Sequence, residues 1–169
     1  MGILRERPVE VYRVPPAVLA IAVFLSLLLQ TYLPLKIPQT RGVDFPLLVT
    51  IYFSLLRRNK IFGIGLGTGL GLIEDALSRH YIGMFGMSKA LVGYLAASSS
   101  VKFNLEHFLP RIVLTAVFVF IHNLFFLGLQ HLPEPPPHFA PLEFAISIVS
   151  NVAVAFLLFQ ALDRFKRPV

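Results

Sequence analysis

The segment from Ile61 to Ser78 reads IFGIGLGTGLGLIEDALS, an apolar run of helix length in which every second residue from Gly63 to Gly71 is glycine. A soluble protein has little use for such a run, whereas a membrane helix packed between two close neighbours needs small residues on both sides. Successive helical residues turn by about 100°, so the glycines fall on two nearly opposite faces. One face holds Gly63, Gly67 and Gly71, and the other holds Gly65 and Gly69. We therefore expect this helix to have two close helix neighbours.

The composition of the chain places it in the membrane. Of its 169 residues, 56% are hydrophobic and 14% are charged, and the mean hydropathy is +0.73. A typical soluble domain has roughly 25% charged residues. The net charge of +6 raises the question of nucleic-acid binding, but the basic residues stand in short clusters at the ends of apolar runs. We expect an integral membrane protein with no nucleic-acid partner. Cysteine is absent, which excludes disulfides and cysteine metal sites.

Six apolar runs are candidates to cross a bilayer. About 20 helical residues span a hydrocarbon core about 30 Å thick. The runs are 14–32, 43–56, 61–77, 83–101, 112–132 and 142–162. The second run is the weakest, because it is short and carries Pro46 near its start; it is tilted, re-entrant or buried among the others. The predicted fold is an all-α bundle of six transmembrane helices in a single domain, residues 1–169.

The basic residues predict the orientation of this bundle, since short cytoplasmic loops hold an excess of Lys and Arg. With six spans, one side receives three basic residues, Lys36, Arg41 and Arg79. The other side receives eleven: Arg5, Arg7, Arg13, Arg57, Arg58, Lys60, Lys102, Arg111, Arg164, Lys166 and Arg167. Both termini are therefore predicted to be cytoplasmic.

Two adjacent carboxylates, Glu74 and Asp75, end the glycine-rich run. One interpretation is that they cap a helix end near the headgroups and that Asp75 pairs with Arg79 four residues later. The other is that Asp75 turns inward, where it organises the turn into the next span or lines a pocket. A paired-carboxylate hydrolase would need a second acidic site on another helix, and none is evident.

Further polar residues lie inside the predicted spans. Lys89 is too deep in the fourth span to reach the headgroups easily, so we expect it to face protein. His122 and Asn123 in the fifth span and Asn151 in the sixth are typical of hydrogen bonds between membrane helices. None of these residues completes a catalytic triad, and no histidine stands at metal-ligand spacing from another ligand. We expect no enzyme activity, no cofactor and no metal.

The run GLGLIEDALSRHYIGMFGMSKALVGYLAA resembles the rod shape-determining protein MreD family. The matching elements are the glycines from Gly67 to Gly71, then Asp75, the turn with Ile82, Gly83 and Phe85, and the stretch from Lys89 to Tyr94. The resemblance implies a non-enzymatic, multi-pass scaffold in the bacterial inner membrane. Such proteins act in the cell-elongation machinery, influencing cell shape and peptidoglycan synthesis. The implied partners are a single-span MreC-like protein and, through it, RodA, a class B transpeptidase and MreB.

The same family is similar to the substrate-binding subunits of energy-coupling-factor transporters, which are six-helix bundles that hold a small molecule near the external side. This similarity keeps a second interpretation open, a vitamin-transporter subunit. Its pocket would be lined by residues such as Asp75, Lys89, His122 and Asn123.

Overall fold

The computed structural model describes residues 12–78, 81–101, 108–132 and 140–168. These residues form six α-helices, one short 3₁₀ helix and a pair of two-residue strands. The helices are α1 (Pro16–Lys36), α2 (Phe45–Arg57), α3 (Lys60–Leu77), α4 (Met84–Ser99), α5 (Phe108–Gln130) and α6 (Pro141–Asp163). The 3₁₀ helix η1 covers Pro38–Gly42, and the strands are β1 (Tyr12–Arg13) and β2 (Arg167–Pro168). Each predicted span thus corresponds to a helix whose bounds differ by a few residues.

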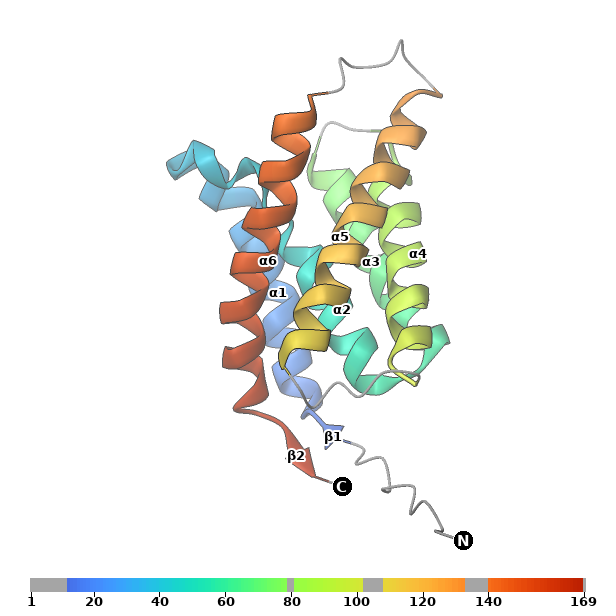
Figure 1. Ribbon diagram of the computed structural model, residues 1–169. Helices are drawn as coiled ribbons and strands as arrows, with labels where there is room; N and C mark the ends of the chain where they lie inside the picture. The colour runs from blue at the N-terminus through green and yellow to red at the C-terminus, as the bar shows by residue number, and fades with distance from the viewer. Residues whose placement is uncertain (1–11, 79–80, 102–107, 133–139, 169) are drawn as a thin grey trace, which may run out of the picture.

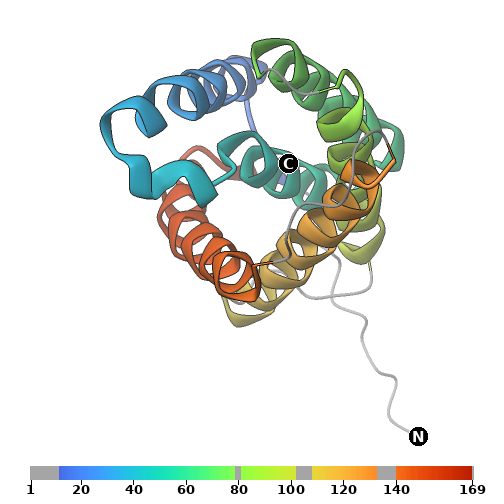
Figure 2. The same ribbon diagram turned by 90° about the horizontal axis from the view of Figure 1, so that it is seen from above.

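The helices run along one common axis, and successive helices point in opposite directions (Figure 1). Seen along that axis, α2 lies inside a ring made by the other five helices (Figure 2). It packs against every one of them, and all its residues from Phe45 to Leu55 are buried. Of the three arrangements considered for the second run, the structure has the one in which it is buried among the others. Thirteen residues extend about 20 Å, which is shorter than a bilayer core.

Local signals in the sequence set both ends of α2. At its start, the side chain of Asp44 accepts a hydrogen bond from the backbone N–H of Leu47, and Pro46 occupies the first turn, where its missing N–H is not needed. At its end, Arg58 adopts a left-handed conformation with φ of 52°. Asn59 then caps α3 by accepting from the N–H of Phe62, so two residues suffice to reverse the chain.

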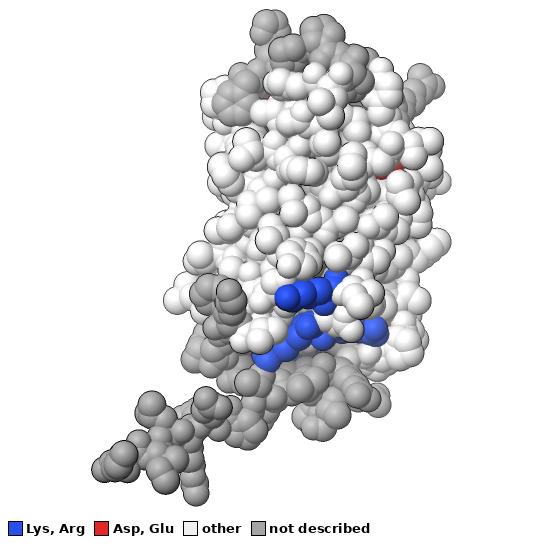
Figure 3. All heavy atoms as spheres, turned by 90° about the vertical axis from the view of Figure 1, so that its right-hand side faces the viewer, with Lys and Arg blue, Asp and Glu red and all other residues white. Residues whose placement is uncertain are grey.

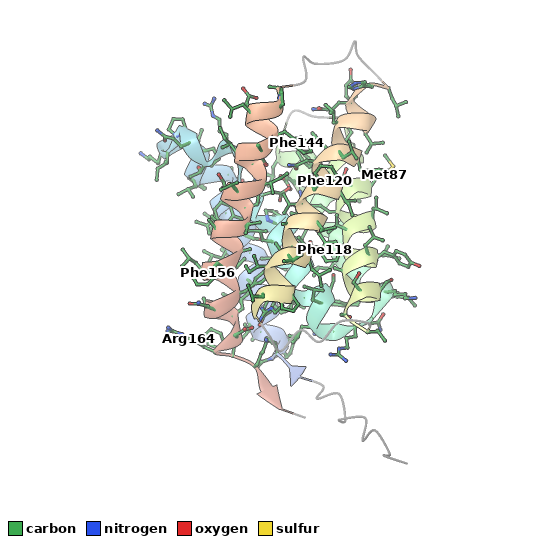
Figure 4. All side chains as sticks on the ribbon, in the orientation of Figure 1. Met87, Phe118, Phe120, Phe144, Phe156 and Arg164 are labelled. Carbon is green, nitrogen blue, oxygen red and sulfur yellow. The ribbon has the colours of Figure 1, made fainter. Side chains whose placement is uncertain are left out.

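Three helices, α1, α5 and α6, are long and apolar enough to cross a membrane by length and composition. Most of their apolar side chains face outward, as Phe24 and Leu157 do with 66% of each exposed. Figure 4 shows the same contrast on labelled residues: Phe156 lies on the outer side of α6, whereas Phe118 of α5 is buried. An outward apolar surface on long helices indicates a membrane protein.

The two ends of the described chain meet at one end of the bundle. β1 pairs antiparallel with β2, with Tyr12 opposite Pro168 and Arg13 opposite Arg167. The side chains of Lys and Arg gather near this end on the face shown in Figure 3. The first and last described segments of the chain therefore lie at the same end of the bundle.

Candidate functional site

The first glycine face of α3 is filled by α4. A Cβ added to Gly63, Gly67 or Gly71 would lie closer than 3.0 Å to backbone atoms of α4. The α4 residues met in this way are Gly93, Lys89 and the Phe85–Gly86 peptide. The two backbones are therefore in direct contact along what we call the α3–α4 seam, formed by these residues, and a larger side chain at any of the three glycines would push the helices apart.

The second glycine face of α3 is open. Gly65 and Gly69 are exposed, and a Cβ at either position would meet no atom within 4 Å. Exposed apolar side chains border them, among them Ile64 (41% exposed) and Ile73 (45% exposed). We call Gly65 and Gly69 the outward glycine face. Of the two glycine faces for which the sequence predicts a close helix, the described part of the chain fills the first and leaves the second open.

Asp75 organises the turn from α3 into α4. Its carboxylate accepts hydrogen bonds from the backbone N–H groups of Gly83 (2.9 Å), Phe85 (3.0 Å) and Gly86 (3.2 Å). The helix has no capping side chain of its own, because its N-cap residue is Gly83, whose φ of 104° favours glycine. Asp75 is 1% exposed and caps α4 from the neighbouring helix. Arg79, the alternative partner considered for Asp75, lies outside the described residues.

Lys89 joins three elements through two ion pairs. Its Nζ donates to Asp44 Oδ2 at 2.7 Å, just before α2, and to Glu74 Oε2 at 2.5 Å, on α3. The same ammonium lies 4.4 Å from the centroid of the Phe85 ring. Lys89 is fully buried and faces protein, and Glu74 is 5% exposed. Because an unpaired charge is very costly in an apolar interior, the three side chains stabilise one another.

Polar side chains of α6 hold the backbone from Gly42 to Asp44, where the chain passes from η1 into α2. Asn151 donates to the carbonyl of Gly42 at 2.7 Å and accepts from the N–H of Asp44 at 2.9 Å. Ser147 donates to the same carbonyl at 2.9 Å and accepts from Asn123 of α5 at 3.2 Å. Backbone outside a helix needs such partners wherever water is excluded.

His122 lies next to these hydrogen-bonded side chains, but only one of its two ring nitrogens has a hydrogen-bond partner among them. The imidazole is 3% exposed and is stacked against Phe85 and Phe126, with ring centroids 6.3 and 6.1 Å apart. Its Nδ1 is 3.3 Å from Oδ1 of Asn123. Its Nε2 is 3.7 Å from Asp44 Oδ2 and has no hydrogen-bond partner. The structure thus brings His122 and Asn123 close to the Lys89 pairs, while Asp75 caps α4.

Asp44 belongs to this cluster although the sequence analysis did not single it out. It contacts Lys89, whose position in the chain is 45 residues away. An Asp just before a helix with proline in its first turn is a capping signal. This signal predicts that Asp44 stands at the start of a helix, but it does not predict the ion pair with Lys89.

The polar groups of this cluster pair mainly with one another. A groove of about 340 Å³ lies on the outside of the bundle, between α4 and α5. Its lining is apolar: Leu91, Ile121, Leu124, Phe125, Gly128 and Leu129. The printed contacts thus pair Lys89 with Asp44 and Glu74, and Asp75 with the start of α4.

Comparison with protein-family models matches residues 13–162 to the family described as rod shape-determining protein MreD. No curated protein matches the chain, and no solved structure does.

Proposed function

Since the chain belongs to the MreD family of rod shape-determining proteins, we propose that it is a non-enzymatic scaffold of the bacterial cell-elongation complex. Membership of the family implies a role in determining rod shape. The finer proposal is that the chain, as a single membrane domain, holds an MreC-like single-span protein. Through this partner it would influence RodA, a class B transpeptidase and MreB, and thereby peptidoglycan synthesis.

We further propose that all six helices lie in the inner membrane with both termini in the cytoplasm. Two observations support this orientation. The helices alternate in direction along one axis, and the Arg57–Lys60 turn lies at the same end as the β1–β2 pair (Figure 1). In this arrangement α2 is enclosed by the other helices and does not need the full length of a lipid-facing span.

The observation that carries the scaffold proposal is the open, small-residue face of α3. Gly65 and Gly69 are spaced four residues apart, which is the Gly-x-x-x-Gly pattern of close helix pairs in membranes. No atom of the described chain fills this face. A single transmembrane helix, such as that of an MreC-like protein, would fit against it in the way that α4 fits against the opposite face.

The internal charge pairs favour a scaffold over a transport subunit. A binding subunit needs polar side chains that remain available to a ligand. Here the ammonium of Lys89 is paired with two carboxylates, and the Asp75 carboxylate accepts from three backbone donors. These groups stabilise the bundle and leave its helix faces for partners.

The test combines depletion with co-purification from mild detergent. Depleting the protein in a rod-shaped bacterium should make the cells round, and the tagged protein should retain a single-span MreC-like partner. Gly65→Leu should lower the yield of that partner several-fold, because its side chain would occupy the outward glycine face. Gly128→Leu is the matched control, since a Cβ at Gly128 of α5 also meets no atom within 4 Å.

Rods that stay normal after depletion would overturn the scaffold proposal, and a simultaneous loss of vitamin uptake would favour the transport interpretation. Equal partner yields from the Gly65→Leu and Gly128→Leu proteins would show that the partner binds elsewhere.

A further inference from the structure

The turn between α2 and α3 carries three basic side chains within four residues: Arg57, Arg58 and Lys60, here called the basic turn. The chain reverses there over two residues, because Arg58 is left-handed and Asn59 caps α3. Arg57 and Lys60 are exposed. Basic side chains gather near this end of the bundle in the face shown in Figure 3.

Two of these cations are held in place by aromatic rings. Because Gly63 and Gly93 bring the backbones of α3 and α4 into contact, Lys60 can reach Tyr94, and its Nζ lies 5.6 Å from the ring centroid. The guanidinium of Arg57 lies 4.2 Å from the centroid of Phe62. Such contacts restrict long side chains before any ligand arrives, which lowers the entropy lost on binding.

No carboxylate among the described residues lies within 4.0 Å of the basic turn. Asp163, at the same end of the bundle, is already engaged by Arg111 at 2.6 Å, by Lys166 at 2.6 Å and by the hydroxyl of Tyr52 at 2.9 Å. The other described carboxylates are Asp44, Glu74 and Asp75 in the buried cluster and Glu143 in the first turn of α6. The positive charge of the basic turn is therefore available to an external anion.

Apolar side chains adjoin these cations. Ile61, next to Lys60, is 83% exposed, and Ile64, one turn further along α3, is 41% exposed. Tyr94, which contacts Lys60, is 40% exposed, and an aromatic ring with a polar tip is typical of the membrane interface. The surface thus combines anion-binding groups with a strip of apolar side chains running toward the middle of the bundle.

We propose that the basic turn binds the phosphate headgroup of an anionic phospholipid whose acyl chain lies along α3 beside Ile61 and Ile64. Arginine presents a planar fork that matches phosphate oxygens, and lysine adds a point charge. A free phosphate would use the cations without the apolar strip, whereas a lipid uses both. Three cations also match a headgroup with two phosphates better than a headgroup with one.

The experiment uses the full chain, purified in a neutral detergent and titrated with defined lipids, with bound lipid counted by native mass spectrometry. Cardiolipin should bind most tightly, phosphatidylglycerol less tightly, and phosphatidylcholine least. The triple variant Arg57→Gln, Arg58→Gln, Lys60→Gln should lose roughly a hundredfold in cardiolipin affinity, because each basic residue near a lipid surface contributes about one fivefold factor. The charge-preserving variant Arg57→Lys, Arg58→Lys should lose much less affinity than the triple variant, because it keeps all three positive charges and gives up only the planar fork of the guanidinium groups.

A single substitution tests the proposal even if the triple variant fails to fold. Lys60→Gln should weaken cardiolipin binding about fivefold. The matched control is Arg164→Gln, which removes an exposed charge from the base of α6 at the same end of the bundle (Figure 4). Arg164→Gln should weaken cardiolipin binding by less than half the factor expected for Lys60→Gln.

Three results would overturn the proposal. Cardiolipin affinity could be the same in the wild type and in Lys60→Gln. Inorganic phosphate at the concentration of the lipid could displace cardiolipin, which would assign the site to a free anion. The triple variant could keep its lipid and lose an acidic protein that co-purifies with the wild type, which would assign the surface to a protein.

Discussion

The α3–α4 pair and the α5–α6 pair of this bundle are held together in different ways. Between α3 and α4 the backbones touch at the seam glycines, and buried charges join the helices through Lys89 and Glu74. Between α5 and α6, bulky side chains meet, as the rings of Phe120 and Phe144 do at 5.6 Å, edge to face. Contact between the two backbones fixes the distance between α3 and α4. Between α5 and α6, flexible apolar side chains allow the distance to vary. The comparison teaches that α3 and α4, which are less apolar than α5 and α6, pack against each other in the more specific way.

The largest effect should come from the buried ammonium of the first pair. Lys89→Met leaves Asp44 and Glu74 buried without their cation, which should lower the free energy of unfolding by about 3–5 kcal/mol. The measurement is thermal or denaturant unfolding in detergent, followed by far-ultraviolet circular dichroism. Lys36→Met, at an exposed position at the end of α1, should change stability by less than about 0.5 kcal/mol.

The double variant Lys89→Met, Glu74→Gln should recover part of this loss, since it removes one of the two unpaired carboxylates. A double variant that is no more stable than Lys89→Met would show that the ion pairs do not account for the effect.

A smaller effect is expected from a single methyl group in the seam. Gly67→Ala would bring a Cβ against the backbone of Lys89, and overpacking of this kind costs about 1–3 kcal/mol. Gly65→Ala adds the same methyl on the outward glycine face, where it meets no atom within 4 Å, and should raise stability by up to about 1 kcal/mol, because alanine favours a helix more than glycine does. Equal melting temperatures for the two alanine variants would remove the distinction between the two faces of α3.

The capping carboxylate should rank next. Asp75→Asn retains one acceptor oxygen but loses the charge and the second oxygen that serve three N–H donors, so we expect a loss of about 1–2 kcal/mol. Hydrogen exchange should rise first at the start of α4. Glu143→Gln, in the exposed first turn of α6, is the matched control, and an equal loss there would argue against a special role for Asp75.

The smallest effect belongs to the lipid-facing surface of the long helices. Leu157 of α6 is 66% exposed, so Leu157→Ala should change stability by less than about 0.5 kcal/mol in detergent. A loss comparable with that of Gly67→Ala would mean that this surface of α6 is buried in the folded protein, for example against a second copy of the chain.

The sequence predicted the helices of this bundle well, because an apolar run of sufficient length has few other uses. It also pointed to Lys89 and Asp75, since charges inside such runs are rare and need partners. What it could not supply was the partner Asp44, which is distant along the chain and belongs to a connecting segment. Nor could it place α2 at the centre, because the short run fits several arrangements until its neighbours are known. Helix periodicity alone separates Gly65 and Gly69 from the seam glycines, and in the structure both are exposed.

The central position of α2 has a consequence for how the protein is made. A ribosome releases α2 before the four helices α3 to α6 that later enclose it, and this short segment with a charged residue at its start is poorly suited to wait alone in lipid. Asn151, which accepts a hydrogen bond from the backbone N–H of Asp44, is on α6, which is synthesised after the other five helices. Insertion must therefore be followed by a closing step, in which α6 docks and seals the bundle.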